Sequence, residues 1–357
     1  MQPSNPHILR LDQFTSELDR FDLVIDVRSP AEFALDHIPG AVNFPVLNNE
    51  ERAQIGTLYK QVSPFAAKKL GAALVSRNIA DHLEQHLLEM PREWRPLIYC
   101  WRGGERSGAF THILNRIGWK AMQLEGGYQG FRRTVIDGLN TAASQFSFLV
   151  VCGMTGSGKT RVLREAQGLG AQVLDLEALA IHRGSVLGNE PNIEQPTQKG
   201  FETALWNVLR CLDPAKPVLV ESESKKVGGV HVPDALMEKI RNGACIELRS
   251  STQTRVAWLL REYDHFLKDT DNFKKKLALL TAHYGKVQIA QWSEAIDGGQ
   301  FPQLVEELLM KHYDPSYQSS IVRNFPRYKQ EHFVQLENDS DAAFADVAKA
   351  IVEKMRV

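Results

Sequence analysis

The eight residues Gly153–Thr160 fit the pattern G-x-x-x-x-G-K-[ST] at every position. The apolar run 148–151 before them predicts a buried strand, and Val162, Leu163 and Ala166 after them have helical spacing. A strand, a glycine-rich loop and a helix in this order form the phosphate-binding loop of an α/β fold. The residues predicted to bind phosphate are Gly153, Gly156, Ser157, Gly158, Lys159 and Thr160.

A second motif is the run Cys100–Ser107, with the sequence Cys-Trp-Arg-Gly-Gly-Glu-Arg-Ser. The apolar residues 96–99 before it predict a strand. An apolar helix face is predicted after it from the spacing of Phe110, Ile113, Leu114 and Ile117. The strand should end at Cys100, and a seven-residue loop should lead to the helix. Such a loop turns its N–H groups inward and favours a thiolate or another anion.

We therefore predict a nucleophilic Cys100, with Arg102 and Arg106 adding positive charge. The rest of the anion cradle is predicted to be Gly103, Gly104 and Ser107. The alternative is a buried structural cysteine in a glycine-rich turn. Two arginines and two glycines so close behind the cysteine favour the nucleophile.

Length and charge limit the class of protein. The 357 residues suggest two or three domains, and a net charge of −1 provides no overall field toward nucleic acid or membrane. An RNA site should therefore be a local basic patch. The four cysteines lack C-x-x-C spacing, which argues against a zinc site or a disulfide framework. Without a signal-peptide pattern or a long apolar run, we expect a cytoplasmic protein with no membrane association.

The first part of the chain alternates strands with helices. Strands are predicted at 23–27, before Pro45, at 96–99 and at 122–128, and residues 50–90 have a helical pattern. Ser29 is a plausible N-cap and Pro30 a first helical residue. This order predicts a parallel sheet with helices on both faces and a ligand at the carboxyl ends of its strands.

These residues resemble a rhodanese domain over about residues 10–137. The resemblance rests on Asp26-Val27-Arg28, Glu32-Phe33, His37–Ala41, the Cys100 loop and Glu125-Gly126-Gly127. Rhodaneses carry sulfur as a cysteine persulfide, as the resemblance implies. The spacing C-x5-R from Cys100 to Arg106 is one residue longer than in most of them and also occurs in cysteine-dependent phosphatases. A wider cradle suits phosphate or a bulkier chalcogen donor.

Residues 140–145 are a small polar segment and the expected linker to a second domain, 146–357. This domain resembles a P-loop kinase-like α/β domain with a helical C-terminal extension from Thr252. Magnesium could be held opposite Thr160 by Asp175, Glu177, Glu221 or Glu223, but these could equally be solvated carboxylates, so no metal ligand is assigned. The same alternative applies to the basic residues that could contact RNA: Lys274–Lys276, Arg323, Arg327 and Lys329.

Together the two motifs resemble the tRNA 2-selenouridine synthase family over nearly the whole length. Further matches are Asp175–Glu177, His182–Ser185 and Glu221–Ser224. The resemblance implies a transferase acting on 2-thiouridine at the wobble position (U34) of tRNA(Lys), tRNA(Glu) and tRNA(Gln). Geranyl diphosphate would first alkylate the sulfur, and selenophosphate would then supply selenium through an S-selanylcysteine at Cys100. No tightly bound cofactor is implied, and we expect a monomer that meets the enzyme producing selenophosphate.

Two other functions stay open at this point. One is a rhodanese-type tRNA sulfurtransferase acting on an ATP-activated base, although the sequence has no separate adenylating motif. The other is a cysteine-dependent phosphatase fused to a small-molecule kinase. The ligand of the P-loop could be geranyl diphosphate, a nucleotide or RNA phosphate. No D-D-x-x-D motif is present, so the sequence does not locate a geranyl pocket.

Overall fold

The computed structural model describes residues 7–185, 187–188 and 193–355 and divides into two compact units. The first unit comprises Met1–Gly138 and Lys199–Asn207, and the second Leu139–Gln198 and Val208–Val357. Residues 140–145, the expected linker, are the last part of helix α6 (Gly127–Gln145). Residues 356–357 of the expected second domain lie outside the described residues. No helix in the described ranges is long and apolar enough to cross a membrane.

A five-stranded parallel sheet organises the first unit. Its order is β1-β5-β4-β2-β3, with β1 at Ile8–Leu9, β2 at Leu23–Asp26, β3 at Val42–Asn43, β4 at Pro96–Tyr99 and β5 at Met122–Leu124. The strands predicted from the apolar runs before Arg28 and before Cys100 are confirmed as β2 and β4. The two-residue β1 has no sequence signal, because it is too short to show a period.

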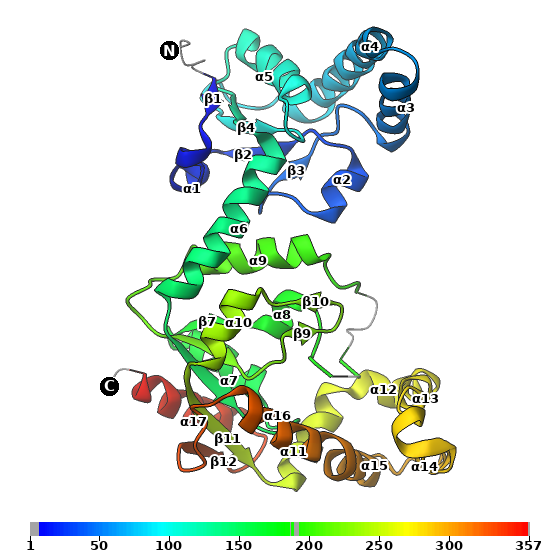
Figure 1. The fold of residues 1–357 in the computed structure, drawn as a ribbon, viewed down its shortest axis with the longest axis vertical. Helices are drawn as coiled ribbons and strands as arrows, with labels where there is room; N and C mark the ends of the chain where they lie inside the picture. The colour runs from blue at the N-terminus through cyan, green and yellow to red at the C-terminus, as the bar shows by residue number, and fades with distance from the viewer. Residues whose placement is uncertain (1–6, 186, 189–192, 356–357) are drawn as a thin grey trace. The chain divides into compact units, whose positions relative to one another are not determined.

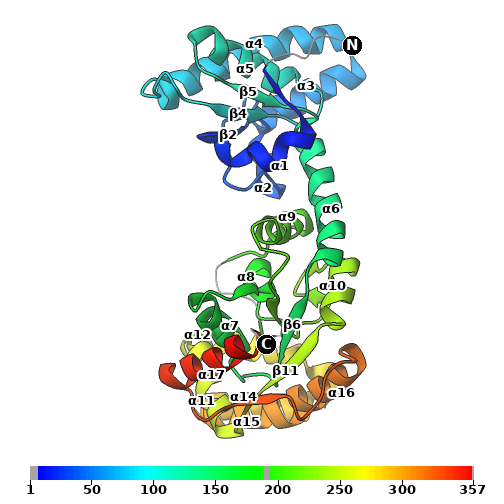
Figure 2. The same ribbon diagram turned by 90° about the vertical axis from the view of Figure 1, so that its left-hand side faces the viewer.

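Helices cover both faces of this sheet, as predicted. They are α1 (Phe14–Glu17), α2 (Pro30–Leu35), α3 (Asn49–Gln61), α4 (Pro64–His82) and α5 (Glu105–Ile117). Figures 1 and 2 show α3, α4 and α5 on one face and α1 and α2 on the other. Phe110 and Leu114 of α5 are buried against β2 and β4, but Ile117 is 53% exposed, so the apolar face ends earlier than predicted.

Residues 199–207 complete the first unit. They belong to α9 (Gln198–Leu209), and Trp206 packs edge-on against Phe131 of α6 with ring centroids 5.6 Å apart. Thr203 Oγ1 donates to Asp36 Oδ2 at 3.1 Å, and the Tyr128 hydroxyl donates to the same oxygen at 2.8 Å. A segment far along the chain thus supplies part of the core of the first unit.

The second unit contains another five-stranded parallel sheet, in the order β12-β11-β6-β8-β7. The strands are β6 (Phe148–Cys152), β7 (Gln172–Leu174), β8 (Val218–Glu221), β11 (Ala244–Ser250) and β12 (Phe333–Leu336). On one face, α7 (Lys159–Gly168) and α17 (Asp341–Lys354) bury Val162, Leu163 and Phe344. Figure 2 shows α10 (Asp234–Arg241) on the other side. Short elements α8 (Leu176–Ala180), β9 (Lys226–Val227) and β10 (Val230–His231) complete the connections.

The predicted helical extension is present. It consists of α11 (Thr252–Glu262), α12 (Asp264–Lys268), α13 (Thr270–Ala278), α14 (Thr281–Asp297), α15 (Phe301–Leu308) and α16 (Asp314–Asn324). Its core includes Phe266, Leu277, Trp292 and Leu304. Strand β12 interrupts the stretch that the pattern predicts to be mostly helical. The predicted α/β class is confirmed: each unit has a five-stranded parallel sheet with helices on both faces, and the second unit carries a helical extension.

Candidate active site

Cys100 lies directly after β4, and its side chain is only 3% exposed. The hydroxyl of Ser107, itself buried, donates a hydrogen bond to Cys100 Sγ at 3.2 Å. Gln123 Nε2 donates to Ser107 Oγ at 3.0 Å and to the carbonyl of Gly104 at 3.1 Å. Gln123 therefore orients Ser107, and Ser107 in turn offers its proton to the sulfur. Gln123 was not predicted, because nothing in the sequence around β5 distinguishes it.

The loop after Cys100 is shorter than predicted. Helix α5 begins at Glu105, so only residues 101–104 separate it from Cys100, and both Arg106 and Ser107 lie in the first turn of the helix. Gly104 has φ +79°, and a Cβ there would lie 2.4 Å from Gln123 Nε2. A side chain at Gly103 would meet no atom within 4 Å, so the geometry requires glycine at only one of the two positions.

The start of α6 holds the other side of the loop. The N–H of Tyr128 donates to the carbonyl of Cys100 at 2.8 Å, and that of Gln129 to the carbonyl of Trp101 at 3.0 Å. Gly127 has φ +52°, and a Cβ there would lie 2.4 Å from the Cys100 carbonyl oxygen. The Glu125-Gly126-Gly127 motif is therefore needed for close approach of two backbone segments.

The two predicted arginines differ in their surroundings. Arg106 Nη1 lies 3.1 Å from Glu32 Oε2, and both side chains are largely buried. Burial opposes ionisation of Glu32, but the Arg106 guanidinium overrides it and lowers the pKa of this carboxyl. Arg102 is exposed, and within the part of the chain that the structure describes it forms no ion pair. The positive charge of Arg106 is thus paired with the Glu32 carboxylate, whereas that of Arg102 is left in solvent.

The predicted phosphate loop joins β6 to α7, as its motif requires. Lys159 Nζ donates to the Gly153 carbonyl at 2.7 Å, and the Gly153 N–H donates to the Tyr317 hydroxyl at 2.6 Å. Arg255 Nε donates to the Thr155 carbonyl at 2.8 Å and forms an ion pair with Asp314. Tyr317, Arg255 and Asp314 come from the helical extension and carry no motif, so the sequence does not reveal their contact with the loop.

Two family models match this chain. Residues 146–284 match the tRNA 2-selenouridine synthase AAA domain, and residues 11–134 match the rhodanese-like domain. The chain is 38% identical over 263 residues to the tRNA 2-selenouridine synthase of Nitrosomonas europaea, which covers 72% of this chain and 68% of that one. It is 34% identical over 337 residues to the synthase of Sulfurovum sp., covering 85% and 90%, and 32% identical over 333 residues to that of Alcanivorax borkumensis, covering 84% and 90%.

The chain belongs to the tRNA 2-selenouridine synthase family. The resemblance predicted from the two motifs is confirmed. In this family member, Cys100 lies within the segment matched by the rhodanese model, and Gly153–Thr160 lies within the segment matched by the synthase AAA model.

The structure separates the four acidic residues that sequence alone leaves equivalent. Thr160 Oγ1 donates to Glu177 Oε2 at 2.8 Å, so Glu177 is the one in contact with the phosphate loop. Glu221 accepts the N–H of Glu177 at 3.0 Å, and Asp175 accepts the N–H of Ala178 as the N-cap of α8. Among the described residues, no group of three or more His, Cys, Asp and Glu side chains is arranged to hold a metal ion.

Three of these carboxyl groups resist ionisation, and burial raises the pKa of Asp175 as well as those of the two glutamates described next. Glu221 is fully buried, and burial together with Asp175, Glu177 and Glu223 raises its pKa well above the usual range. One of its oxygens, Oε2, has no hydrogen-bond partner in the described ranges of the chain. Burial and the neighbouring Glu177 raise the pKa of Glu223 to about 8, against the opposing effect of Lys159. Near pH 7 this cluster therefore carries less negative charge than its composition suggests.

The phosphate loop forms one wall of a cavity of about 580 Å³ within the second unit. Cationic groups around this cavity are Lys159, Arg161, Arg164 and Arg183. Tyr317, His182 and Glu223 also line it, which brings the family-like segments 182–185 and 221–224 to the same site as the loop. The cavity has the size and the charge to take a phosphorylated small molecule.

Part of the predicted basic patch on α13 forms an ion pair within the protein. Lys274 forms an ion pair with Asp297, whereas Lys275 is exposed. Phe273, next to Lys274, is 4% exposed and packs in the helical core with Phe266. The aromatic side chains here are thus core residues, and Lys275 extends into solvent.

Proposed function

We propose that this protein replaces the sulfur of wobble 2-thiouridine in tRNA with selenium, in two steps that use its two units. The observation that supports this is the presence, in one member of the synthase family, of a hydrogen-bonded thiol after β4 and a lysine-bearing phosphate loop in a large cavity. The expected substrates are tRNA(Lys), tRNA(Glu) and tRNA(Gln), with geranyl diphosphate and selenophosphate as co-substrates.

The phosphate loop serves the first step. The thiouridine sulfur attacks C1 of geranyl diphosphate, a C–S bond forms, and the C–O bond breaks with its electron pair leaving on diphosphate. Lys159 and the N–H groups of the loop stabilise that leaving charge, which is the kind of interaction that lowers a barrier most effectively. Alkylation matters because a thiocarbonyl sulfur leaves poorly, whereas geranyl thiol leaves well.

Cys100 serves the second step. The electron balance of this step determines which phosphorus compound is released. The thiolate attacks selenium, an S–Se bond forms, and the Se–P pair leaves with phosphorus as phosphite. The terminal selenium then attacks C2 of the nucleoside, and geranyl thiol leaves. A thiol reductant attacks Cys100 Sγ, which releases 2-selenouridine and forms a mixed disulfide, and a second thiol reduces this disulfide to free Cys100. In a route without covalent Cys100, selenophosphate attacks C2 itself, and water releases phosphate. Phosphorus NMR of the released product distinguishes the two routes.

Nucleoside analysis of thiolated tRNA incubated with both co-substrates tests the proposal. Cys100→Ala should abolish 2-selenouridine while S-geranyl-2-thiouridine accumulates, because the first step needs no thiol. Lys159→Ala should lower both products. Full 2-selenouridine formation by Cys100→Ala would refute the covalent role, and the absence of either product from the wild-type protein would refute the proposed function.

A chromogenic phosphate ester separates the proposal from a cysteine-dependent phosphatase, which would hydrolyse the ester with Cys100 as nucleophile. We expect no such hydrolysis. We expect the protein to be a monomer and to bind the enzyme that produces selenophosphate. Light scattering of each protein alone and of their mixture tests both expectations.

A further inference from the structure

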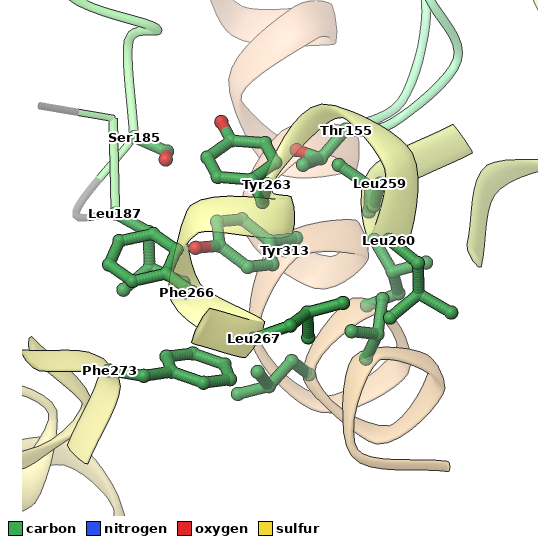
Figure 3. A pocket seen from close by; sticks show the side chains of 13 residues that line it. Thr155, Ser185, Leu187, Leu259, Leu260, Tyr263, Phe266, Leu267, Phe273 and Tyr313 are labelled. Carbon is green, nitrogen blue, oxygen red and sulfur yellow. The ribbon is translucent and has the colours of Figure 1, made fainter. Parts of the chain in front are cut away.

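A second, apolar cavity adjoins the phosphate-loop cavity. It lies among α11, α12, α13, α15 and the segment Leu309–Tyr313, and the apolar side chains that line it include Leu260, Phe266, Leu267, Phe273, Val305 and Leu308. Figure 3 shows Ser185, Thr155 and Tyr263 at one end of this cavity and Phe273 at the opposite end. Its lining therefore changes from hydroxyl-bearing to purely apolar along its length.

The two cavities have part of their walls in common. Both are lined by Thr155, Ser185, Leu259, Tyr263 and Tyr313. Thr155 belongs to the phosphate loop itself. A ligand whose anionic group lies against Lys159 can thus extend its remaining part past Tyr263 and Tyr313 into the apolar cavity.

The size of the apolar cavity sets the size of what it can hold. Its volume is about 60 Å³. A group the size of a water molecule occupies roughly 10–15 Å³ of a cavity volume measured in this way, and a methylene group is of similar size. The cavity therefore holds about five carbon atoms, which is one isoprenoid unit.

The chemistry of the walls favours hydrocarbon over water or a nucleotide base. Cavities lined by leucine, phenylalanine and valine stay dry and bind apolar ligands. A purine would bring ring nitrogens that Leu260, Leu267 and Val305 could not satisfy, and unpaired polar groups are costly to bury. Burial raises the pKa of Tyr313 to about 12, so the entrance is lined by a neutral hydroxyl.

We propose that this apolar cavity holds the distal part of the isoprenoid chain of a prenyl diphosphate whose diphosphate lies on the phosphate loop. The inference rests on the geranyl transfer proposed above and adds where the chain lies and what limits its length. It also supplies a prenyl site in a sequence without a D-D-x-x-D motif.

Binding of a chain-length series to the full protein is the first test. Inorganic diphosphate, dimethylallyl diphosphate and geranyl diphosphate are compared by calorimetry. Each additional buried carbon strengthens binding by up to about fourfold, so geranyl diphosphate should bind at least about tenfold more tightly than dimethylallyl diphosphate. Equal affinities for the two prenyl compounds would overturn the proposal.

Filling the cavity is the second test. Leu260→Trp should weaken geranyl diphosphate binding at least about tenfold and leave inorganic diphosphate binding unchanged. Leu279→Trp, at a position that is 64% exposed, is the matched control and should change neither. Val305→Phe should repeat the effect of Leu260→Trp, and the melting temperature of each variant shows whether it folds. Leu267→Ala should instead improve binding of the longer farnesyl diphosphate relative to geranyl diphosphate.

The outcomes separate this inference from the proposed function. If Lys159→Ala weakens geranyl diphosphate binding while Leu260→Trp and Val305→Phe do not, the cavity assignment is wrong and the function stands. If Leu260→Trp weakens ATP binding and spares geranyl diphosphate, the cavity holds a base and the assignment is wrong. If geranyl diphosphate does not bind the wild-type protein, both fail.

Discussion

The hydroxyl of Ser107 donates a hydrogen bond of 3.2 Å to Sγ of Cys100, from the first turn of the helix that follows the cysteine loop. Gln123 donates to the same hydroxyl, whose single proton has the Cys100 sulfur and, at 3.4 Å, the Gly104 carbonyl as acceptors. Hydrogen bonds to a charged acceptor stabilise it by about 1.5–3 kcal/mol. This pair therefore links the helix start to the reactivity of the thiol.

Ser107→Ala should slow alkylation of Cys100 by iodoacetamide at pH 7 about tenfold, because the thiolate loses a donor. Formation of 2-selenouridine should fall with it. Peptide mass spectrometry of Cys100 follows the alkylation rate, and Ser76→Ala, at an exposed position on α4, is the matched control. An unchanged alkylation rate would mean that the hydroxyl only fills space.

Glu32→Gln should lower the thermal midpoint at pH 7 by about 2–4 °C, because it breaks the partly buried ion pair with Arg106. The pKa of Glu32 is lowered in the folded protein, so this stabilisation is present above the usual carboxyl pKa and is lost as the pH falls through the folded value. The difference between the variant and the wild type should therefore shrink below about pH 4. Glu93→Gln, at an exposed position, should show no such trend.

Glu223 should make diphosphate binding sensitive to alkaline pH. Its pKa of about 8 keeps it mostly neutral at pH 7, and its ionised fraction grows as the pH rises through that value. The new charge competes for Lys159 and repels the ligand. The ratio of wild-type to Glu223→Gln dissociation constants should be near one at pH 6.5 and rise to about ten at pH 9. Protonation of the ligand cancels in this ratio, so a constant ratio would contradict the prediction.

The α13 lysines should contribute to tRNA affinity through Lys275 more than through Lys274, whose ammonium already pairs with Asp297. Lys275→Gln should reduce the slope of log affinity against log salt by about one if it contacts one phosphate. Lys354→Gln, at an exposed position near the end of α17, serves as the control, and filter binding at several salt concentrations gives the slope. Equal slopes for both variants would show that Lys275 is only solvated.

Short sequence patterns predict those strands and helices whose apolar spacing is visible within a few consecutive residues. The apolar runs before Cys100 and Gly153 are strands, and Val162, Leu163 and Ala166 are buried as their spacing predicts. The start of α5 was placed too late, because the first turn carries the polar residues Glu105 and Arg106, which resemble loop residues.

Contacts between distant segments could not be predicted from spacing. Gln123 reaches Ser107 only because β5 lies next to β4, and Tyr317 reaches the Gly153 N–H from a helix more than a hundred residues away. The role of Glu32 has the same origin, since its partner Arg106 lies on another element. The apolar cavity also depends on how α11, α13 and α15 pack together, which no single amphipathic pattern specifies.

Tyr128 and Gln129 hold the carbonyls of Cys100 and Trp101, and Gly127 leaves no space for the loop to shift toward α6. These two hydrogen bonds tie the backbone of Cys100 and Trp101 to the first turn of that helix, so the buried sulfur is held in place. A nucleobase stacked in an RNA strand cannot reach a sulfur held there. We therefore expect the RNA, and not the cysteine loop, to change conformation. The target nucleoside should be unstacked and turned out of its strand before it reaches the Cys100 site. The energetic cost of that step is lowest in a single-stranded loop, where unpairing is not required.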